Sequence, residues 1–595
     1  MAASIGAICL VAAGTTGLVG ASLPRAQAAI ARALEVVQVA LIAVATTLLA
    51  IAMLRVDGRY AEVADTTSRL TPWPYRLAGL WGGLRGSMLF FTFVLSVAAV
   101  VVVRGAMARR TVTVFISALT IVSVVVANPF ALLRVPAIDG GGLTPVLRHP
   151  AMLIHPPLLY TGLALLIAAA FCRIDVASAQ SGPTALVAGA AVLSVALALG
   201  SWWASAELGW VGLWAWDPIE NAGLVPLLLA IAAVHAGPAR SPRRLTTALV
   251  LVAGWTAFAG TVLTRSGAAL SVHAFADAQR LGRVLGAITL VLLLGGASVV
   301  MRVPAEPDAA AVRRPAVAAV AMGLLGLAAV VVTAGTVGPL VREAFGGEQS
   351  VVQGTFFARW TAPIAVVALG ALAFAGRASP GSRRRLLVGE GTAFSAATVA
   401  FPIWRSAWVC LVLGLAVWSM VVPAGRLRAP VALAHLGLAL TIAGAVLSGA
   451  GGSVTAPLRP GQVVEIEGWS VRFDRLETVR LADRERVIAR TSVLHDGSPL
   501  AALHPSLDRW NGTTASLAES ATTSWRGVDL QLVLRTVRRD ANAPAGAVVL
   551  DVHVRPLIRL AWWGPVLMAA GLLWTAWARR RARRSAPPVI QTAAG

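Results

Sequence analysis

The sequence predicts an all-α polytopic membrane protein of about fifteen transmembrane helices, with a small external β-rich domain inserted before the last helix. Three observations predict this fold class. Of the 595 residues, 57% are hydrophobic and 13% are charged, whereas soluble domains carry roughly 25% charged residues. The mean hydropathy is +0.76. Apolar runs of about 20 residues, enough for one helix to cross a bilayer, recur along the chain and are broken for long stretches only at 57–87 and 451–556.

Fifteen windows are predicted as membrane spans. The first, 4–22, has no basic segment before it and no small-residue cleavage site after it, so we expect a retained span rather than a signal peptide. The window 387–403 is interrupted by Gly389, Glu390 and Gly391. In chain order the windows are 4–22, 34–54, 88–105, 112–130, 154–172, 184–202, 220–236, 245–264, 282–301, 315–335, 361–377, 387–403, 406–423, 430–449 and 557–577.

The arginines predict the orientation of these spans. The formal net charge is +23, which in a soluble protein would suggest nucleic acid. Here the basic residues fall in short clusters between apolar runs, which is typical of cytoplasmic loops, so no nucleic-acid partner is expected. Counting back from a cytoplasmic C-terminus places every cluster on the cytoplasmic side and the N-terminus outside. The clusters are Arg109 with Arg110, Arg243 with Arg244, Arg313 with Arg314, residues 383–385 and residues 579–584.

These spans define four predicted parts: a transmembrane bundle (1–450), an external β domain (451–556), a final helix (557–578) and a basic cytoplasmic tail (579–595). The segments VVEIEGWSVRFDRL, GVDLQLVLRTV and AVVLDVHVRP alternate apolar and polar residues with period two, which indicates short strands. The β domain either docks a partner or braces the bundle. Residues 57–87 are predicted to be a loop on the same outer side, ending in WGGLRGS.

Two histidines are predicted inside the membrane. His235 lies about one turn before the basic segment GPARSPRR, and His435 lies roughly two turns after RLR at 426–428. Both therefore sit toward the cytoplasmic side, where an ionisable residue is a candidate functional group. Imidazoles from two helices at one depth are suited to bind opposite faces of one haem iron. The alternative is a pair of hydrogen bonds between helices.

A second pair is predicted on the outer side. His155 opens a span in LIHPPLLYTG, and His273 follows another span in TRSGAALSVHAFADAQR. The pair is a candidate for a second haem or metal, and the alternative is polar residues at span ends. The remaining histidines are predicted to be solvated surface residues: His149, His495, His504 and His553.

The segment SWWASAELGWVGLWAWDPIENAG at 201–223 concentrates aromatic residues between the two pairs. Flat indole faces suit a flat porphyrin, so we interpret this segment as a haem-binding platform rather than a belt of interfacial anchors. The acidic residues Asp217 and Glu220 follow the last of its tryptophans and are candidate positioning groups. The tryptophans are Trp202, Trp203, Trp210, Trp214 and Trp216.

Several motifs resemble those of a known family. WASAELGWVGLWAWDPIENAGLVP resembles the WWD signature of the haem-handling membrane proteins CcmC, CcmF and CcsA. Further motifs, in family order across about residues 55–580, resemble the CcmF/NrfE branch. They are WGGLRGSMLF, NPF at 128–130, HPPLLYTG at 155–162, TRSGAALSVHAFA at 264–276, AHLGLALTIAG at 434–444 and RPLIRLAWWGPVLMAAG at 555–571.

The resemblance implies a haem lyase of the bacterial cytoplasmic membrane. Such an enzyme attaches haem through thioether bonds to the C-x-x-C-H cysteines of apocytochrome c on the outer face. The resemblance also implies that haem is the transferred substrate, that it arrives on the chaperone CcmE, and that CcmH and CcmI-like partners present the apocytochrome. A resident b-type haem is the possible reductant, with quinol in the membrane as a possible source of its electrons. His155 and His273 would ligate the transferred haem, with Trp202 and Trp203 beside it. His235 and His435 would ligate a resident haem b.

By the same resemblance, Trp210, Trp214, Trp216, Asp217 and Glu220 would form the catalytic surface. The sequence departs from the family pattern at Arg85, where Glu is common, and at Leu213, where a tryptophan is common. Two alternatives stay open. One is a non-enzymatic haem exporter or chaperone loader of the CcmC or CcsA type. The other is an unrelated polytopic transporter, which would typically show internal repeats and broken helices.

Overall fold

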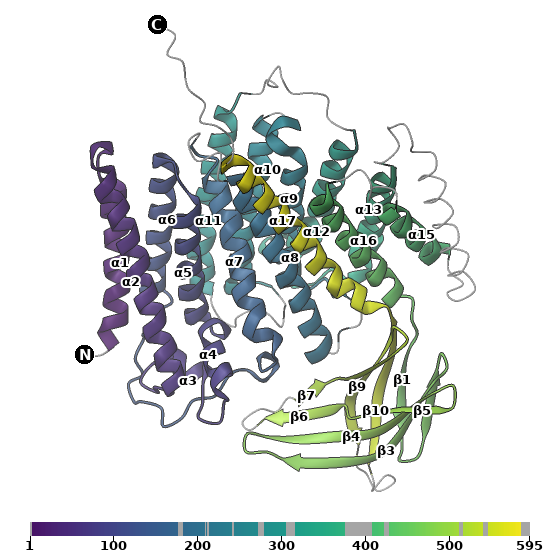
Figure 1. The fold of residues 1–595 in the computed structure, drawn as a ribbon. Helices are drawn as coiled ribbons and strands as arrows, with labels where there is room; N and C mark the ends of the chain where they lie inside the picture. Colours follow the sequence, from purple (N-terminus) through teal and green to yellow (C-terminus); the bar gives the residue numbers. More distant parts are fainter. Residues whose placement is uncertain are drawn as a thin grey trace.

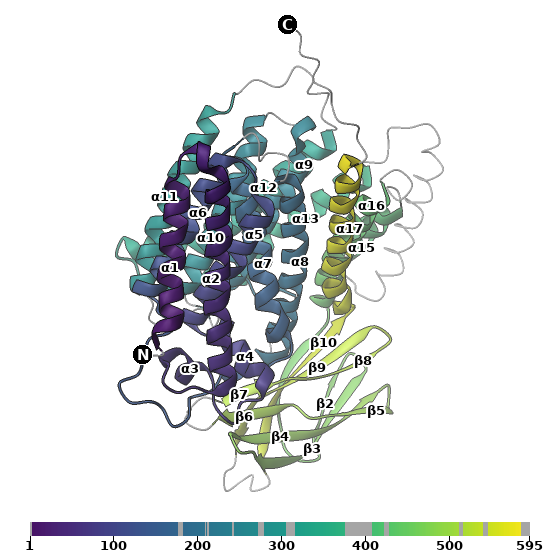
Figure 2. The same cartoon turned by 60° about the vertical axis from the view of Figure 1, so that its left-hand side comes forward.

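The computed structural model describes residues 3–175, 182–208, 210, 213–240, 243–269, 271, 279–304, 316–374, 407–421, 428–510, 516–538 and 546–584. These residues form a bundle of long helices that carries a β domain at one end (Figure 1). Helix α1 begins at the end of the bundle that carries the β domain, and α17 runs from the β domain toward the opposite end (Figures 1 and 2).

Among the described residues, thirteen helices are long and apolar enough to cross a membrane, so the chain is a multi-pass membrane protein. They are α1 (Ala3–Ser22), α2 (Ala28–Arg55), α5 (Leu84–Val102), α6 (Ala106–Val125), α7 (Ala151–Phe171), α8 (Gly182–Glu207), α9 (Pro218–Arg240), α10 (Arg243–Ser266), α11 (Gln279–Arg302), α12 (Ala316–Ala344), α13 (Gly354–Phe374), α16 (Ala429–Ser448) and α17 (Ile558–Arg584).

Two of the fifteen predicted spans are not among these thirteen. The window 406–423 corresponds to α15 (Ala407–Val421), which is helical over 15 residues. The window 387–403 lies outside the described residues, as do the arginine clusters at 313–314 and 383–385.

Several predicted boundaries are wrong because an apolar window stops at the first charge, whereas the helix continues. Arg109 and Arg110 belong to α6 rather than to a loop. Arg109 is accommodated there because its Nη2 lies 2.8 Å from Glu35 Oε2 on α2. The final helix likewise runs through residues 579–584, which were predicted to be tail.

The predicted outer loop at 57–87 also contains helices, α3 (Ala61–Thr66) and α4 (Trp73–Gly82), and the first residues of α5. Proline near the start of α4 favours a helix there, because the first turn has no hydrogen-bond acceptor for that backbone N–H. Buried Ala78, Gly79 and Leu80 hold α4 against its neighbours.

Helices α16 and α17 approach each other closely through glycine. A Cβ atom on Gly437 would lie 2.4 Å from the carbonyl oxygen of Gly564, and one on Gly571 would lie 2.5 Å from the backbone nitrogen of Ala434. Small residues permit this contact between membrane helices. The last helix of the chain therefore packs directly on the helix that carries His435.

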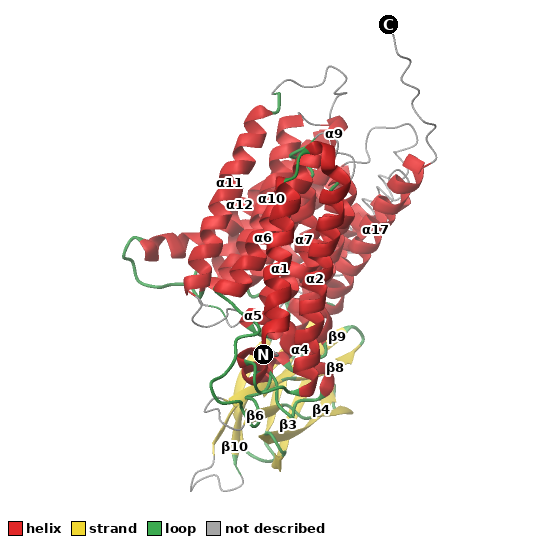
Figure 3. Ribbon diagram, turned by 90° about the vertical axis from the view of Figure 1, so that its left-hand side faces the viewer, coloured by secondary structure: helices red, strands yellow, loops and turns green. Residues whose placement is uncertain are grey.

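The β domain is a two-layer sandwich (Figure 3). One sheet has the strand order β1-β10-β9-β8, and the other β2-β3-β4-β6-β7 with β5 paired to β4. Trp469 and Val471 of one sheet pack against Leu532 and Val552 of the other, so the predicted strands are confirmed. The strands are β1 (Ser453–Leu458), β2 (Val463–Ile466), β3 (Trp469–Arg480), β4 (Arg484–His495), β5 (Ser498–Leu503), β6 (Ser506–Trp510), β7 (Ser516–Glu519), β8 (Ala521–Trp525), β9 (Val528–Arg538) and β10 (Ala547–Pro556).

Arg148, in the segment before α7, joins the bundle to the β domain. Its Nη1 donates to Asp483 Oδ2 at 2.7 Å, and its guanidinium carbon lies 4.2 Å from the centre of the Trp510 ring. Burial lowers the pKa of Arg148, and Asp483 opposes that shift. Because an arginine stays charged in proteins, this contact is a charge-assisted link between the two parts.

Replacing Arg148 with methionine should loosen the joint, because a charged hydrogen bond and a cation–π contact are lost. Hydrogen bonds to charged groups contribute about 1.5–3 kcal/mol, so limited proteolysis should release the β domain about tenfold faster. Arg472→Met is the control, since Arg472 pairs with Asp474 on its own strand and is half exposed. Equal release rates for the two variants would contradict the assignment.

Candidate functional site

The predicted inner histidines lie close together on two different helices. The ring centres of His235 on α9 and His435 on α16 are 6.1 Å apart, and the ring planes are nearly perpendicular at 88°. Their helices have different principal neighbours: α9 packs on α10 and α12, and α16 packs on α15 and α17. The two imidazoles thus meet where two groups of helices come together.

Both imidazoles are oriented by their own helices. His235 Nδ1 lies 2.9 Å from the Ile231 carbonyl oxygen, and His435 Nδ1 lies 2.8 Å from that of Val431. Because a carbonyl oxygen only accepts, each Nδ1 carries the proton, and each neutral ring has its lone pair on Nε2. Metal-binding histidines are typically fixed in this way by a hydrogen bond from the other nitrogen.

The spacing of the pair fits a metal between them. Bonds of about 2 Å from a metal to each of two imidazole nitrogens separate the ring centres by roughly 6 Å, close to the 6.1 Å observed. Among the described residues no group of three or more His, Cys, Asp and Glu side chains is placed to bind a metal ion. Two axial imidazoles are the set that a haem iron needs, because the porphyrin supplies its other ligands.

Of the outer pair, the structure describes His155, while His273 lies outside the described residues. His155 Nδ1 lies 2.7 Å from the Ala196 carbonyl oxygen of α8. A Cβ atom on Gly200 would lie 2.6 Å from His155 Cε1, so the imidazole packs directly on the α8 backbone. Ser271, two residues before His273, donates to Asp217 Oδ1 at 2.8 Å.

The predicted tryptophan platform is divided among several environments. Trp203 is buried and donates to the Val146 carbonyl oxygen at 2.8 Å. Trp202 is 38% exposed and meets the His149 ring edge-on at 4.8 Å. Trp210 packs against the small apolar cluster that contains Trp203, and Trp214 donates to Asn221 Oδ1 at 3.2 Å.

Trp216 is held in an uncommon conformation. Its φ of 64° lies in the left-handed region, at a cost of about 1–3 kcal/mol for such residues. Its ring stacks on Phe357 at 5.0 Å with a 6° interplanar angle, and its carbonyl oxygen accepts from Asn221 Nδ2 at 3.1 Å. Backbone strain that is maintained by several contacts is typical of functional sites.

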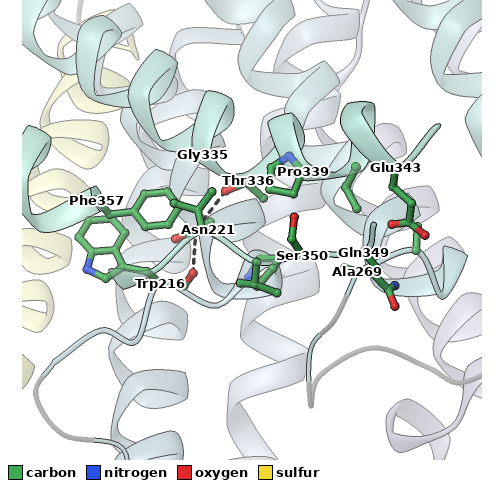
Figure 4. A pocket seen from close by; sticks show the side chains of 15 residues that line it. Trp216, Asn221, Ala269, Gly335, Thr336, Pro339, Glu343, Gln349, Ser350 and Phe357 are labelled. Atoms are coloured by element: carbon green, nitrogen blue, oxygen red, sulfur yellow. Dashed lines mark hydrogen bonds between the residues drawn. The ribbon is translucent and has the colours of Figure 1, made fainter. Parts of the chain in front are cut away.

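A cavity with about 340 Å³ of empty space, part of it open to solvent, lies beside Trp216 (Figure 4). Asn221 points toward it from α9, where its Nδ2 also donates to Thr336 Oγ1 of α12 at 3.0 Å. Glu343 lines the far side.

Asp217 and Glu220 form a reciprocal cap at the start of α9. Asp217 Oδ1 accepts from the backbone N–H groups of Ile219 at 2.8 Å and Glu220 at 3.4 Å. Glu220 Oε2 accepts in return from the backbone N–H of Asp217 at 3.4 Å and of Ala215 at 3.1 Å. With Pro218 as the first helical residue, this is a capping box. Both carboxylates are therefore engaged in starting the helix.

Two residues near the site were not singled out from the sequence. Arg265, at the end of α10, is 1% exposed and donates to Ser87 Oγ at 3.0 Å and Tyr160 Oη at 3.2 Å. It thereby connects the motifs WGGLRGSMLF, HPPLLYTG and TRSGAALSVHAFA. The sequence signal that could have identified it is an arginine at the end of an apolar span. His149 was predicted to be a solvated surface residue, but it is half-buried against Trp202, and burial lowers its pKa.

Arg85, the departure from the family pattern, pairs with acidic residues of α3. Its Nη1 lies 3.1 Å from Asp65 Oδ2 and 3.4 Å from Glu62 Oε2. Glu62 also accepts from the Gly86 backbone N–H at 2.7 Å, and burial raises its pKa. The charge at position 85 is thus balanced within the 57–87 segment.

The fold and site define a polytopic membrane protein with a pair of half-buried histidines between its helices, and a family model described as "Cytochrome C assembly protein" matches residues 81–259. The chain is 30% identical to the cytochrome c-type biogenesis protein CycK of Bradyrhizobium diazoefficiens, covering 93% of this chain and 92% of that protein. It is also 30% identical to CcmF of Pseudomonas aeruginosa, covering 96% of each chain. The chain belongs to the CcmF/CycK family of cytochrome c-type biogenesis proteins.

The fold matches a solved structure described as "Cytochrome c Heme Lyase CcmF", with a TM-score of 0.77, 20% sequence identity and 97% coverage of both chains. The resemblance noted from the motifs is thereby confirmed. Membership of this family excludes the alternative of an unrelated transporter.

If Asp217 acts as a helix cap, an asparagine at this position should preserve the stability of the protein, and an alanine should lower it. Asp217→Ala should lower the free energy of unfolding by about 0.5–2 kcal/mol, the usual contribution of an N-cap side chain. Asp217→Asn should stay within about 0.5 kcal/mol of the unmodified protein, because asparagine caps equally well. Thermal unfolding of the detergent-solubilised chain measures both. An asparagine variant as unstable as the alanine variant would show that the negative charge is required.

Proposed function

We propose that this protein is a haem lyase of cytochrome c maturation. It attaches haem by thioether bonds to the two cysteines of the C-x-x-C-H motif of apocytochrome c. The observation that carries the proposal is the opposed pair of His235 and His435, 6.1 Å apart, in a chain whose relatives are named cytochrome c-type biogenesis proteins. We place the reaction on the outer face of a bacterial cytoplasmic membrane, with the N-terminus outside and the C-terminus in the cytoplasm.

The inner pair would hold a resident haem b. His235 and His435 would bind its iron through Nε2, because the Nδ1 atoms are engaged by Ile231 and Val431. When bound, this group would supply one-electron chemistry, with quinol from the lipid as the source of electrons. The contribution of the chain is to fix both rings before the cofactor enters, since each ring is already oriented by its own helix.

The outer face would hold the haem that is transferred, as a substrate. We assign its iron to His155 and His273, and its porphyrin to the exposed part of the tryptophan-rich segment. Trp202 is exposed there, Trp210, Trp214 and Trp216 are half-buried, and the buried Trp203 supports the segment from within. Asp217 and Glu220 support this surface by starting α9 at the end of the tryptophan-rich segment. The haem would arrive on a CcmE-type chaperone, and CcmH and CcmI-like proteins would present the apocytochrome.

The reaction itself needs mainly proximity. Each cysteine thiol adds across one vinyl group: the S–H bond and the vinyl π bond are lost, and a C–S and a C–H bond form. Holding the thiols beside the vinyl groups can supply about 7–11 kcal/mol in favourable cases. We assign that positioning to the outer histidines and the tryptophan surface, and no general acid to this chain.

The inner pair is tested by the absorption spectrum of the purified, reduced protein. We expect sharp b-type bands that are lost in His235→Ala and in His435→Ala. His504→Ala is the matched control, because His504 is exposed in the β domain, and it should keep the bands. A protein that carries no haem when made in a host with ample haem would refute the inner site.

The lyase role is tested by staining for covalent haem in a strain that lacks the gene. Covalent c-type haem should be absent, and the wild-type gene should restore it. His155→Ala and His273→Ala should fail to restore it while keeping the b-type spectrum, because the two pairs bind different haems. Normal c-type cytochromes in the deletion strain would refute the proposal. A non-enzymatic haem loader would instead leave attachment intact once free haem is supplied outside.

A further inference from the structure

The C-terminal end of α8, which leads into the tryptophan-rich segment, is capped by the β domain. The last carbonyl oxygens of a helix have no partner within the helix. Here Ser205 O accepts from Gln531 Nε2 at 2.8 Å, and Ala206 O accepts from Ser520 Oγ at 2.9 Å. Strand β9 and the residue between β7 and β8 therefore supply side chains that replace water at this helix end.

Arg555 of β10 extends this contact from the helix into the loop. Its Nη1 donates to Ser205 Oγ at 2.7 Å, and its Nη2 donates to the Trp210 carbonyl oxygen at 2.7 Å. One branch of the planar guanidinium thus binds the last turn of α8, and the other binds the segment that follows the helix. A lysine ammonium does not reproduce this forked geometry.

Both hydrogen bonds of Arg555 are directed toward α8 and the segment after it, while Asp529 of the β domain attracts the same guanidinium electrostatically. Asp529, the residue opposite it in the sheet register, is paired with Arg559 at 3.3 Å. Arg555 is 2% exposed, and burial lowers its pKa to about 10, so it remains protonated at neutral pH. The negative end of the α8 dipole favours a cation at this position.

The surroundings of Arg555 are polar and buried. His553, two residues earlier on β10, is 6% exposed, and neither of its ring nitrogens has a hydrogen-bond partner among the described residues. Gln531, opposite His553 on β9, is 2% exposed. These side chains share one face of the sheet, which is the face turned toward the end of the bundle. The geometry there is set by a few directional bonds rather than by apolar packing.

We propose that Arg555 is a positioning residue for the tryptophan-rich segment, holding Trp210 and the end of α8 in the arrangement that haem transfer requires. This inference rests on the proposed function. Trp210 packs against the cluster that contains Met152 and Trp203, so the hold on its carbonyl group extends to a cluster formed by the start of α7 and the end of α8. The β domain then acts as a brace for the site.

The test measures the loop directly, by hydrogen–deuterium exchange of residues 205–217 in the full-length, haem-loaded protein. Arg555→Lys keeps the charge and breaks the fork, and Ser205→Ala removes one acceptor while leaving Arg555 in place. Both should raise exchange in this segment, Arg555→Lys by about tenfold, because charged hydrogen bonds that close the segment are lost. Arg535→Lys is the control: Arg535 pairs with Asp551 inside the β domain and should leave the segment unchanged.

Two further readouts separate positioning from a general loss of structure. The b-type spectrum and the thermal midpoint should match the wild type in Arg555→Lys, while the rate of covalent haem attachment falls about tenfold or more. Exchange within twofold of the wild type in both Arg555→Lys and Ser205→Ala would overturn the inference. So would raised exchange with an unchanged attachment rate. A wild-type chain without attachment activity would refute the proposed function, and the exchange comparison would still decide whether Arg555 holds the loop.

Discussion

Charged side chains that the membrane helices bury bind partners within the chain, because lipid offers no water in their place, and these contacts fix much of the arrangement of the bundle. Glu35 of α2 and Arg109 of α6 neutralise each other and join the first helices. Arg265 binds Ser87 and Tyr160 and joins α10 to α5 and α7. The apolar surfaces give the bundle its cohesion, but these directional contacts decide which helix lies beside which. The same requirement at the end of α8 brings the β domain against the bundle.

Much of the fold follows from the sequence, because a bilayer imposes a length and a composition on every span. The strands of the β domain are equally visible as period-two alternation, but their division into two packed sheets is not. What the apolar windows miss is charge inside helices: Arg109 lies within α6 because Glu35 neutralises it, and α17 continues through residues 579–584. The sequence pattern does not predict the helices α3 and α4 either, because they are too short to show a helical period and are held by contacts with distant segments.

Some parts of the candidate site could likewise be predicted from the sequence, and others could not. The depth of His235 and His435 relative to arginine clusters is a one-dimensional property, so the sequence placed the two side by side correctly. The tryptophan segment depends on three-dimensional packing, and the five indoles enter different environments instead of one plane. Asp217 and Glu220 show how local chemistry can resemble a site, since their spacing is that of a helix cap. Arg555 lies 345 residues from Trp210 in sequence, and no local pattern connects them.

The glycine contacts between α16 and α17 have a consequence for how the molecule is made. Helix α16 carries His435, yet its closest neighbour is the final helix, which follows the whole β domain in the chain. A ribosome releases the chain from its N-terminus onward, so α9 and His235 enter the membrane long before α17 exists. Helix α16 therefore packs on its principal neighbour only after the β domain and the last helix have been made. A prematurely ended chain would leave the glycine face of α16 without the helix that covers it.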